Sequence, residues 1–297
     1  MRKHYSNPSE DCYLFSFRIT IVGLGLMGGS LGLALRNQCK AIFACDKDQN
    51  VVKMARKMKI AEKISSNPLD VIPEADVVIL ATPVQSIINL IEELPKMHPG
   101  SPIVLDLGST KEEICKTLAN LPARFDPIGG HPMCGKEKLG LVNAEMTLFR
   151  DATFAFTPLP RTSSKAIEFA NSLARAIGAK SFWIEPKTHD RWVAATSHLP
   201  YILSTALALS TPHECAPLIG PGFRSVTRLA ATSDSMMMDI LKTNRKNILL
   251  AIQCFQVELS SLESLMQSND FDGLRDKLMD GTISYKRLLE FAAMEIK

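Results

Sequence analysis

The chain has 297 residues, of which 46% are apolar, and its net charge is +3. This length exceeds one typical doubly wound domain and allows two domains with sizeable cores. The small net charge, without a dense run of Lys and Arg, argues against a nucleic-acid partner, and the sequence shows neither a signal peptide nor an apolar run that would cross a membrane. Seven scattered cysteines, without a C-x-x-C pair or metal-ligand spacing, predict free thiols and no metal site. Free thiols indicate a reducing compartment, so we expect a cytoplasmic protein. Because the net charge is small, we expect its partners to be small molecules.

Residues 18–30 predict a buried strand that turns sharply into a helix. Their glycines have the G-x-G-x-x-G spacing of a dinucleotide site: Gly23 permits the tight turn, Gly25 lets the backbone approach a pyrophosphate, and Gly28 lets the helix pack against the strand. The strand before the motif and the helix after it make a glycine turn without a ligand the weaker interpretation. The cofactor-binding residues predicted in this stretch are Gly23, Gly25, Leu26, Met27 and Gly28.

A second strand, residues 40–46, ends at Asp46. A carboxylate at this position accepts hydrogen bonds from the ribose hydroxyls and repels a ribose phosphate, which favours NAD over NADP. Lys47 beside it weakens that inference, and a solvated aspartate that opens a turn is the alternative.

The third strand, residues 75–81, is followed by Thr82 and Pro83, which we expect to face the cofactor. Proline suits the first turn of a helix, so Pro83 is expected to start the helix over residues 84–94. A fourth strand covers residues 103–107, and residues 152–157 and 180–184 are further strands around a helix near residues 163–177. This alternation predicts a Rossmann-type, doubly wound parallel sheet covered on both faces, over residues 15–184.

Residues 185–297 predict a second, all-α domain, so that the fold class is α/β with a helical C-terminal domain. Apolar periodicity is helical from Thr188 onward, over residues 188–209, 224–231, 246–266, 271–279 and 282–296. The apolar positions of the long helix near residues 246–266 are wider than one stripe. We therefore expect this helix to be buried on more than one side, either in the core of its domain or in a dimer interface.

Loops at the carboxyl ends of parallel strands surround the ligand crevice of such a sheet, and two candidates lie there. His131, in Gly-Gly-His-Pro, can take a hydroxyl proton while a hydride leaves the same carbon. The alternative, a histidine that caps a turn, is weaker because the glycines clear space around it. Ser109 suits a hydrogen bond to a substrate hydroxyl or to the nicotinamide, but it also suits the N-cap of the following helix, and the spacing leaves both open.

In the helical domain, His189 and His198 are two and a half turns apart, so they are not expected to share a face or to bind one metal ion. His189 is predicted to be structural. Pro200 removes the helical hydrogen bond to residue 196, which exposes polar groups near Ser197 and His198. This favours a substrate contact for His198, with a satisfied buried histidine as the alternative. The remaining histidines are expected at the surface: His4, His98 and His213.

Arg224 and Arg228 lie four residues apart after a Gly-Pro-Gly turn. A guanidinium in a cleft grips a carboxylate with two hydrogen bonds, the usual way to orient a small acid. Helical spacing places both arginines on one face, so one of them can be only a solvated neighbour.

Together these residues resemble the prephenate and arogenate dehydrogenases of tyrosine biosynthesis. The matching segments occur in family order between residues 18 and 241. They are residues 23–30, 106–111, 129–135, 189–190, 197–200 and 222–228. The histidine loop and the Ser-His-Leu-Pro segment are more specific than the glycine motif.

The resemblance implies an NAD-dependent oxidative decarboxylation of prephenate to 4-hydroxyphenylpyruvate. It implies that His131 accepts the proton of the ring hydroxyl, that Ser109 contacts this hydroxyl, and that Arg228 grips a carboxylate. Ser197 and His198 complete the expected substrate contacts, and the helical domain is expected to form a homodimer.

Many bacterial members have a tryptophan in the stretch that matches residues 236–238, where this chain has three methionines. An arogenate dehydrogenase, or a cyclohexadienyl dehydrogenase that accepts both substrates, is therefore the nearest alternative. An NAD-sensing regulator without chemistry is a remote one, because it would not need His131, Ser109 and Arg228 together.

Overall fold

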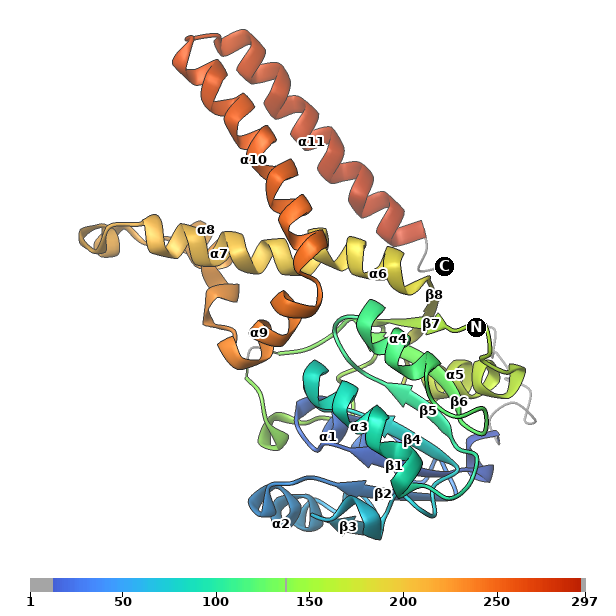
Figure 1. The fold of residues 1–297 in the computed structure, drawn as a ribbon. Coiled ribbons are helices and arrows are strands. Elements are labelled where there is room, and N and C mark those ends of the chain that lie inside the picture. Colours follow the sequence, from blue (N-terminus) through green and yellow to red (C-terminus); the bar gives the residue numbers. More distant parts are fainter. Residues whose placement is uncertain (1–12, 137, 295–297) are drawn as a thin grey trace, which may run out of the picture. The chain divides into compact units, whose positions relative to one another are not determined.

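A computed structural model describes residues 13–136 and 138–294 of the chain (Figure 1). The chain divides into two compact units, one up to Arg245 and one from Lys246 onward. The first unit contains the sheet, the helices that cover it, and four further helices. The second unit is a pair of long helices.

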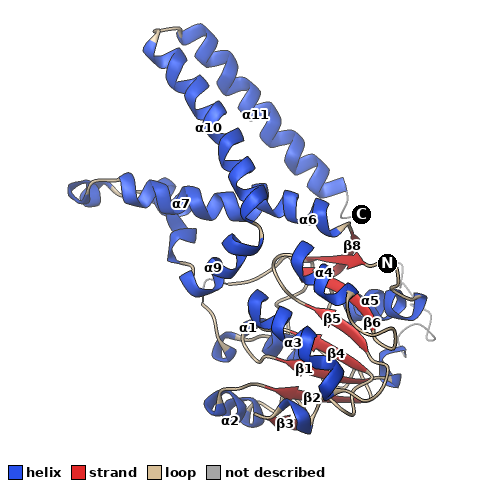
Figure 2. Cartoon of the chain, in the orientation of Figure 1, coloured by secondary structure: helices blue, strands red, loops and turns tan. Residues whose placement is uncertain are grey.

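The first unit is built on an eight-stranded sheet with the order β3-β2-β1-β4-β5-β6-β7-β8 (Figure 2). The first six strands in this order are parallel, and the order reverses between β1 and β4, where such sheets bind dinucleotides. The predicted Rossmann-type sheet is therefore confirmed. The strands are β1 (Arg18–Val22), β2 (Ala41–Cys45), β3 (Lys63–Ser65), β4 (Val77–Leu80), β5 (Ile103–Asp106), β6 (Asp126–Pro132), β7 (Thr153–Pro158) and β8 (Lys180–Trp183).

The last two strands depart from the predicted parallel sheet. β7 runs antiparallel to β6, with His131 opposite Ala155, and β8 runs parallel to β7. Parallel neighbours need a long crossover, usually an α-helix, whereas the described part of the β6–β7 connection contains only a short 3-10 turn (Leu141–Asn143). The chain therefore returns along the edge of β6 in the opposite direction.

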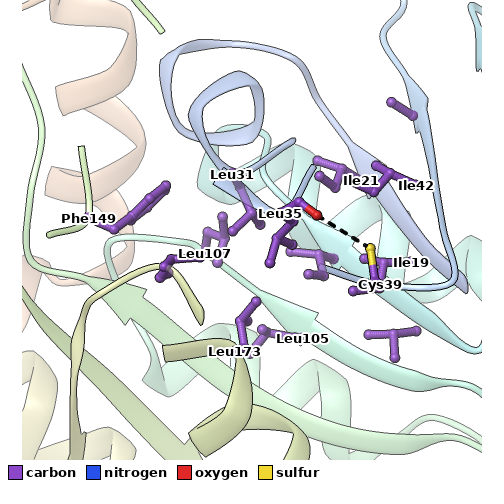
Figure 3. Close-up of a cluster of buried hydrophobic side chains, with 14 of the residues drawn as sticks. Ile19, Ile21, Leu31, Leu35, Cys39, Ile42, Leu105, Leu107, Phe149 and Leu173 are labelled. Carbon is purple, nitrogen blue, oxygen red and sulfur yellow. Dashed lines mark hydrogen bonds between the residues drawn. The ribbon is translucent and has the colours of Figure 1, made fainter. Parts of the chain in front are cut away.

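Two apolar layers cover the faces of the sheet, because side chains alternate along each central strand. Ile19 and Ile21 of β1 face one layer, and Val22 faces the other. Figure 3 shows part of the first layer, where Ile19 and Ile21 lie near Leu31 and Leu35. Helices α1 (Leu26–Ala34), α2 (Gln49–Lys57) and α5 (Ser164–Ala176) cover this face, and α3 (Val84–Met97) and α4 (Glu112–Ala119) cover the other.

Four further helices belong to the first unit: α6 (Pro186–Val193), α7 (Leu199–Ser210), α8 (Pro221–Thr227) and α9 (Asp234–Thr243). A π-helical segment, Ala194–His198, joins α6 to α7 where the sequence predicted one continuous helix. The sequence did not predict α9. This helix is tied to α3 and to the loop after β5 by two hydrogen bonds, from the Gln85 backbone N–H to Asp239 Oδ2 (3.1 Å) and between the hydroxyls of Thr110 and Thr243 (2.8 Å).

The second unit consists of α10 (Arg245–Gln267) and α11 (Phe271–Met294), linked by an ion pair between Lys277 and Glu258 (2.7 Å). α11 continues through Gly281, where the sequence predicted two helices. By length and composition α10 could cross a membrane (mean hydropathy 1.3), contrary to the expectation from the sequence. Much of the apolar surface of both helices is exposed in the single chain: Leu249, Leu250, Val257, Leu259, Met266, Phe271, Leu278, Met279, Ile283, Tyr285, Leu288, Leu289 and Phe291.

Candidate active site

The glycine loop connects β1 to α1 at the point where the strand order reverses. Gly23 has φ +97°, a conformation that favours glycine, and its N–H donates to the carbonyl of Cys45 (2.8 Å). A Cβ on Gly28 would lie 1.9 Å from the Gly23 carbonyl oxygen, whereas a Cβ on Gly25 would meet nothing within 4 Å. Leu26 and Met27 form the first turn of α1, where backbone N–H groups lack partners within a helix. The loop therefore offers open space and free donors to a pyrophosphate.

Two alanine variants separate the roles of these glycines. Gly28→Ala is expected to lower the free energy of unfolding by about 1–3 kcal/mol, because its Cβ collides with backbone that cannot move aside. Gly25→Ala is expected to leave stability nearly unchanged and to weaken NAD binding, since its Cβ fills open space. Urea unfolding and NAD titration measure the two effects. Equal stability of both variants would contradict the proposed packing of α1.

Asp46 follows β2 and lies beside the glycine loop. Its Oδ2 accepts the N–H of Leu24 (2.8 Å) and its Oδ1 accepts the N–H of Asp48 (2.9 Å). Each oxygen keeps a second lone pair, so the carboxylate is held in place and can still accept hydroxyl hydrogens. Asp48, and not Asp46, caps α2 through the N–H of Asn50 (2.8 Å). This geometry fits the predicted ribose contact, which remains a prediction.

Asp46→Ser is expected to shift cofactor preference toward NADP. Loss of a charged acceptor for the ribose hydroxyls should lower kcat/KM with NAD roughly 10- to 100-fold, while removal of its negative charge relieves repulsion of a 2′-phosphate. Initial rates with NAD and NADP measure the ratio. Asp48→Ser, which removes a neighbouring negative charge and keeps a residue able to cap α2, is the matched control, and an unchanged ratio in Asp46→Ser would rule out this role of Asp46.

Thr82 and Pro83 follow β4, on the other side of the reversal from Asp46. Pro83 is the N-cap of α3, as the sequence predicted. The buried Oγ1 of Thr82 has no hydrogen-bond partner among the described residues. The Cγ2 atom of Thr82 packs against the glycine loop, because a Cβ added to Gly23 would lie 2.6 Å from it. A buried hydroxyl without a partner is rare in folded proteins, and a ligand group would satisfy it. The residues that follow β1, β2 and β4 therefore fit a dinucleotide.

Behind the histidine strand lies a buried ion pair that the sequence did not reveal. Asp106 ends β5 and pairs with Lys111, and both side chains are fully buried. Asp106 also accepts the N–H groups of Gly108 (2.8 Å) and Gly130 (3.2 Å), and the Lys111 ammonium donates to the Gly130 carbonyl (2.6 Å). Burial raises the pKa of Asp106, and the Lys111 ammonium and the two N–H donors act in the opposite direction. The pair therefore holds the backbone immediately before His131 from both sides.

His131 lies within β6, not on the loop that the sequence predicted, and its ring is half-buried. Its Nδ1 is 3.0 Å from Nε2 of His189, and the two rings meet edge to face with centroids 5.1 Å apart. Burial lowers the pKa of His131 well below its usual value, and the neighbouring His189, Lys111 and His198 lower it further. The ring is therefore neutral at pH 7 and able to take a proton.

The structure gives His189 a place that the sequence did not predict. Its Nδ1 is 2.8 Å from Asp190 Oδ1, and the Asp190 carboxylate also accepts the N–H groups of Lys111 (2.7 Å) and Glu112 (2.9 Å) at the start of α4. Asp190 thus fills the capping role that Ser109 could have had. The Ser109 hydroxyl, in the loop after β5, forms no hydrogen bond within the described part of the chain. Its predicted contact with the substrate remains a proposal.

His198 ends the π-helical segment and is buried, whereas the preceding Ser197 is exposed. The predicted disturbance of the helix before Pro200 therefore takes the form of a π turn. Asn244 Nδ2 lies 3.2 Å from His198 Nδ1 and donates to the Asp190 carbonyl (2.7 Å). Burial lowers the pKa of His198 to about 4, although Asp190 opposes the shift.

The π turn also changes the expectation that His189 and His198 do not share a face. His198 is nine positions after His189. In an α-helix nine positions correspond to a rotation of about 900°, or two and a half turns, which places the two side chains half a turn apart. A π turn accommodates one extra residue, so the effective separation is about 800°, and the two side chains are only about 80° apart. Both histidines therefore reach the residues around Asp190. Among the described residues, no group of three or more His, Cys, Asp or Glu side chains is arranged to hold a metal ion.

The other predicted residues lie further along the chain. Arg228 begins a 3-10 turn, Arg228–Ala231, that packs against α7, and its side chain is exposed. Arg224 is exposed on α8. The helix type changes between the two arginines, so they do not continue one α-helical face. His98, predicted at the surface, is instead buried: its Nε2 contacts the Ala75 carbonyl (2.8 Å) and its Nδ1 accepts the Gly100 N–H (3.0 Å). His213 is exposed, and His4 lies outside the described residues.

A Rossmann-type glycine loop at the reversal of strand order, together with a neutral, tethered histidine in β6, is typical of a dinucleotide-dependent dehydrogenase. The sequence matches two family profiles, "Prephenate dehydrogenase, nucleotide-binding domain" over residues 31–183 and "Prephenate dehydrogenase, dimerization domain" over residues 185–280. The chain belongs to the prephenate dehydrogenase family. It is 31% identical over 268 residues to a prephenate dehydrogenase of Bacillus subtilis, covering 86% of this chain and 72% of the relative.

Solved structures agree with this assignment. Prephenate dehydrogenase from Aquifex aeolicus, in complex with hydroxyphenyl propionate and NAD+, is 26% identical with a TM-score of 0.84, over 91% of this chain and 98% of that chain. Arogenate dehydrogenase from Synechocystis is also 26% identical, with a TM-score of 0.79, over 91% of this chain and 99% of that chain.

Proposed function

We propose that this chain is an NAD-dependent prephenate dehydrogenase that converts prephenate to 4-hydroxyphenylpyruvate in tyrosine biosynthesis. The observation that carries the proposal is the neutral His131 ring, held through Nδ1 by His189 at the carboxyl-end side of the sheet, in a chain of this family. NAD is the cofactor, and its phosphates are assigned to the loop of Gly23, Gly25 and Gly28.

The residues of the chain have distinct tasks in this reaction. His131 takes the proton of the ring hydroxyl at Nε2, so that an O–H bond breaks and an N–H bond forms. Bound NAD would supply the acceptor for the hydride that leaves the carbon bearing this oxygen. The ring carboxylate leaves as carbon dioxide, and the ring becomes aromatic. Ser109 is assigned to the hydroxyl, and His198 and Ser197 are assigned to the body of the substrate.

We further assign residues 15–184 to a dinucleotide-binding domain and residues 185–297 to a helical substrate and dimerisation domain. The exposed apolar surface of α10 and α11 supports a homodimer, because a single chain leaves that surface in water. A partner subunit, and not a lipid bilayer, would then cover α10, and the protein would be cytoplasmic. Sedimentation at several protein concentrations tests the dimer.

An arogenate or dual-specificity enzyme is the second candidate. Its support is the likeness to the Synechocystis arogenate dehydrogenase and the presence of Met236, Met237 and Met238 where many members have tryptophan. Met237 is buried in α9 and Met238 is exposed. The substrate side chain, keto acid or amino acid, is the feature in which the two candidates differ.

Initial rates decide between the candidates. The rate of NAD reduction would be measured with prephenate and with arogenate, and both would be repeated with NADP. Faster turnover of prephenate with NAD supports the main proposal, and faster turnover of arogenate moves the enzyme to the second candidate. Absence of turnover with either substrate would leave only the nucleotide-binding fold.

Arg228 is assigned to a substrate carboxylate, and its removal tests this role. Arg228→Ala is expected to raise KM for prephenate roughly 10- to 100-fold, because two charge-assisted hydrogen bonds are lost, with a smaller change in kcat. Arg224→Ala, an exposed arginine on α8, is the matched control. An unchanged KM in Arg228→Ala would remove the assignment.

A further inference from the structure

Two histidines of the candidate site, the half-buried His131 and the buried His198, are both linked to Asp190 by different routes. The side chain of Asp190 leads through His189 to His131, and its backbone carbonyl leads through Asn244 to His198. The exposed fractions of His189, Asp190, His198 and Asn244 are 2%, 1%, 1% and 3%, so water has little access to the contacts among these four residues, and His131 is half-buried. Each hydrogen atom in this network can therefore be assigned from what its partner can accept or donate.

The first route begins at α4. Backbone N–H groups only donate, and two of them, from Lys111 and Glu112, point to the Asp190 carboxylate (2.7 and 2.9 Å). The positive end of the helix dipole further stabilises the ionised carboxylate. Asp190 must then accept from His189 as well, which puts a hydrogen on His189 Nδ1. In a neutral His189, Nε2 is the acceptor, so the hydrogen between the two rings belongs to His131 Nδ1. His131 is left with a bare Nε2.

The second route begins at the Asp190 carbonyl. A carbonyl oxygen only accepts, so the Asn244 atom beside it (2.7 Å) must be the amide nitrogen. The second hydrogen of the same nitrogen points to His198 Nδ1 (3.2 Å), which must therefore be an acceptor. A neutral His198 then carries its hydrogen on Nε2. The two rings have opposite tautomers.

We propose that Asp190 gives the two histidines opposite roles: through His189 it leaves His131 with a bare Nε2 that accepts a proton, and through Asn244 it leaves His198 with an Nε2–H that donates a hydrogen bond. The kinetic part of this proposal rests on the proposed function, and the tautomers do not. His189, Asp190 and Asn244 are positioning residues. When His131 gains a proton at Nε2, its Nδ1–H stays directed at His189, and the Asp190 carboxylate is the counter-charge for the new cation.

The tautomers can be read directly by solid-state NMR of the full-length protein with 15N-labelled histidine at pH 7.5. His131 and His189 are expected to carry hydrogen on Nδ1, and His198 on Nε2. His98 is an internal reference, because the Ala75 carbonyl and the Gly100 N–H fix its hydrogen on Nε2. Substitution of each histidine by glutamine assigns its signals, and the exposed His213→Gln should remove one set of signals and change nothing else. Hydrogen on Nε2 of His131, hydrogen on Nδ1 of His198, or an imidazolium form of either ring would overturn the proposal.

Two variants separate the two routes by kinetics. Asp190→Asn is expected to lower kcat for prephenate about 10- to 100-fold with little change in KM, because the cation on His131 loses its counter-charge. Asn244→Asp is expected to move the hydrogen of His198 to Nδ1 and to raise KM for substrate. If Asp190→Asn does not fold, His189→Phe is the second variant, because it removes the acceptor for His131 Nδ1. In the NMR spectrum of His189→Phe, His131 should no longer show one fixed tautomer. His189, His198 and Lys111 all face His131, so kcat is compared across pH 5–9 in each variant.

These readouts separate the two proposals. The predicted tautomers in a protein that does not turn over prephenate would support the hydrogen-bond assignment and overturn the proposed function. Turnover of prephenate by a protein with the wrong tautomers would support the proposed function and overturn the hydrogen-bond assignment. Wild-type kinetics in Asp190→Asn and in His189→Phe would overturn the positioning role even if the tautomers are correct.

Discussion

His131→Asn is expected to lower kcat for prephenate by about 100- to 10,000-fold, which is the range that a positioned general base contributes. Asparagine can occupy the ring position and accept a hydrogen bond, but it cannot take a proton near neutral pH. The substitution leaves the glycine loop and Asp46 intact, so NAD affinity should not change. Steady-state rates and NAD titration of the same preparation measure both quantities.

The control for this variant is His213→Asn, which changes an exposed histidine to which no site role is assigned and should retain full activity. The pH dependence offers a second check. Because burial and neighbouring groups lower the pKa of His131, the wild-type rate should stay high below pH 6.5 and fall only at more acidic pH. A kcat in His131→Asn within tenfold of the wild type would show that another group takes the proton.

Lys111→Met is expected to lower the free energy of unfolding by about 3–5 kcal/mol, the usual cost of removing one partner of a buried ion pair. Methionine fills most of the lysine volume, so the loss comes from Asp106, which stays fully buried without its cation. The Gly130 carbonyl also loses a donor, so the strand that carries His131 should be less well held. Urea unfolding at pH 7.5 measures the change.

Lys116→Met is the matched control, because Lys116 is exposed on the same helix and its loss should cost little. The sign of the pH effect is specific to the buried pair. In Lys111→Met the pKa of Asp106 should rise further, so the native state binds a proton more readily than the unfolded state, and part of the lost stability should return as pH is lowered. Equal losses in the two variants, or a loss independent of pH, would contradict this account.

Local patterns were sufficient to predict most of the sheet. The apolar runs of β1, β4 and β5 and the glycines after β1 specify strand, turn and helix within a few residues, because they reflect backbone preferences and burial on both faces. The direction of β7 was not predictable in this way, since it depends on how the β6–β7 connection crosses the sheet. α9 was also missed, because its residues follow a short run of mixed polarity and the helix is held by distant groups such as Gln85.

The residues of the candidate site also differ in how well local sequence predicts their roles. His131 and the glycine loop have sequence neighbours that indicate their chemistry, whereas the importance of Asp190 and Asn244 comes from partners far away in the sequence. Asp190 caps a helix that begins 78 residues earlier, at Glu112, and no local rule for N-caps can find such a contact. The adjacent pair His189 and Asp190 was the one available signal, and from it the sequence predicted only a structural role for His189.

The strand order also has a consequence for the order in which the chain folds during synthesis. β1 pairs with β2 and β4, so the strands that frame the nucleotide crevice are complete once residue 80 has been made. The helical residues that are linked to Asp190, including His198 and Asn244, are translated more than 100 residues later. At about 5–20 residues per second, the ribosome needs several seconds for that interval, which is long compared with strand pairing and helix formation. We expect the nascent chain to form the crevice first and to add the catalytic surroundings to a sheet that has already assembled.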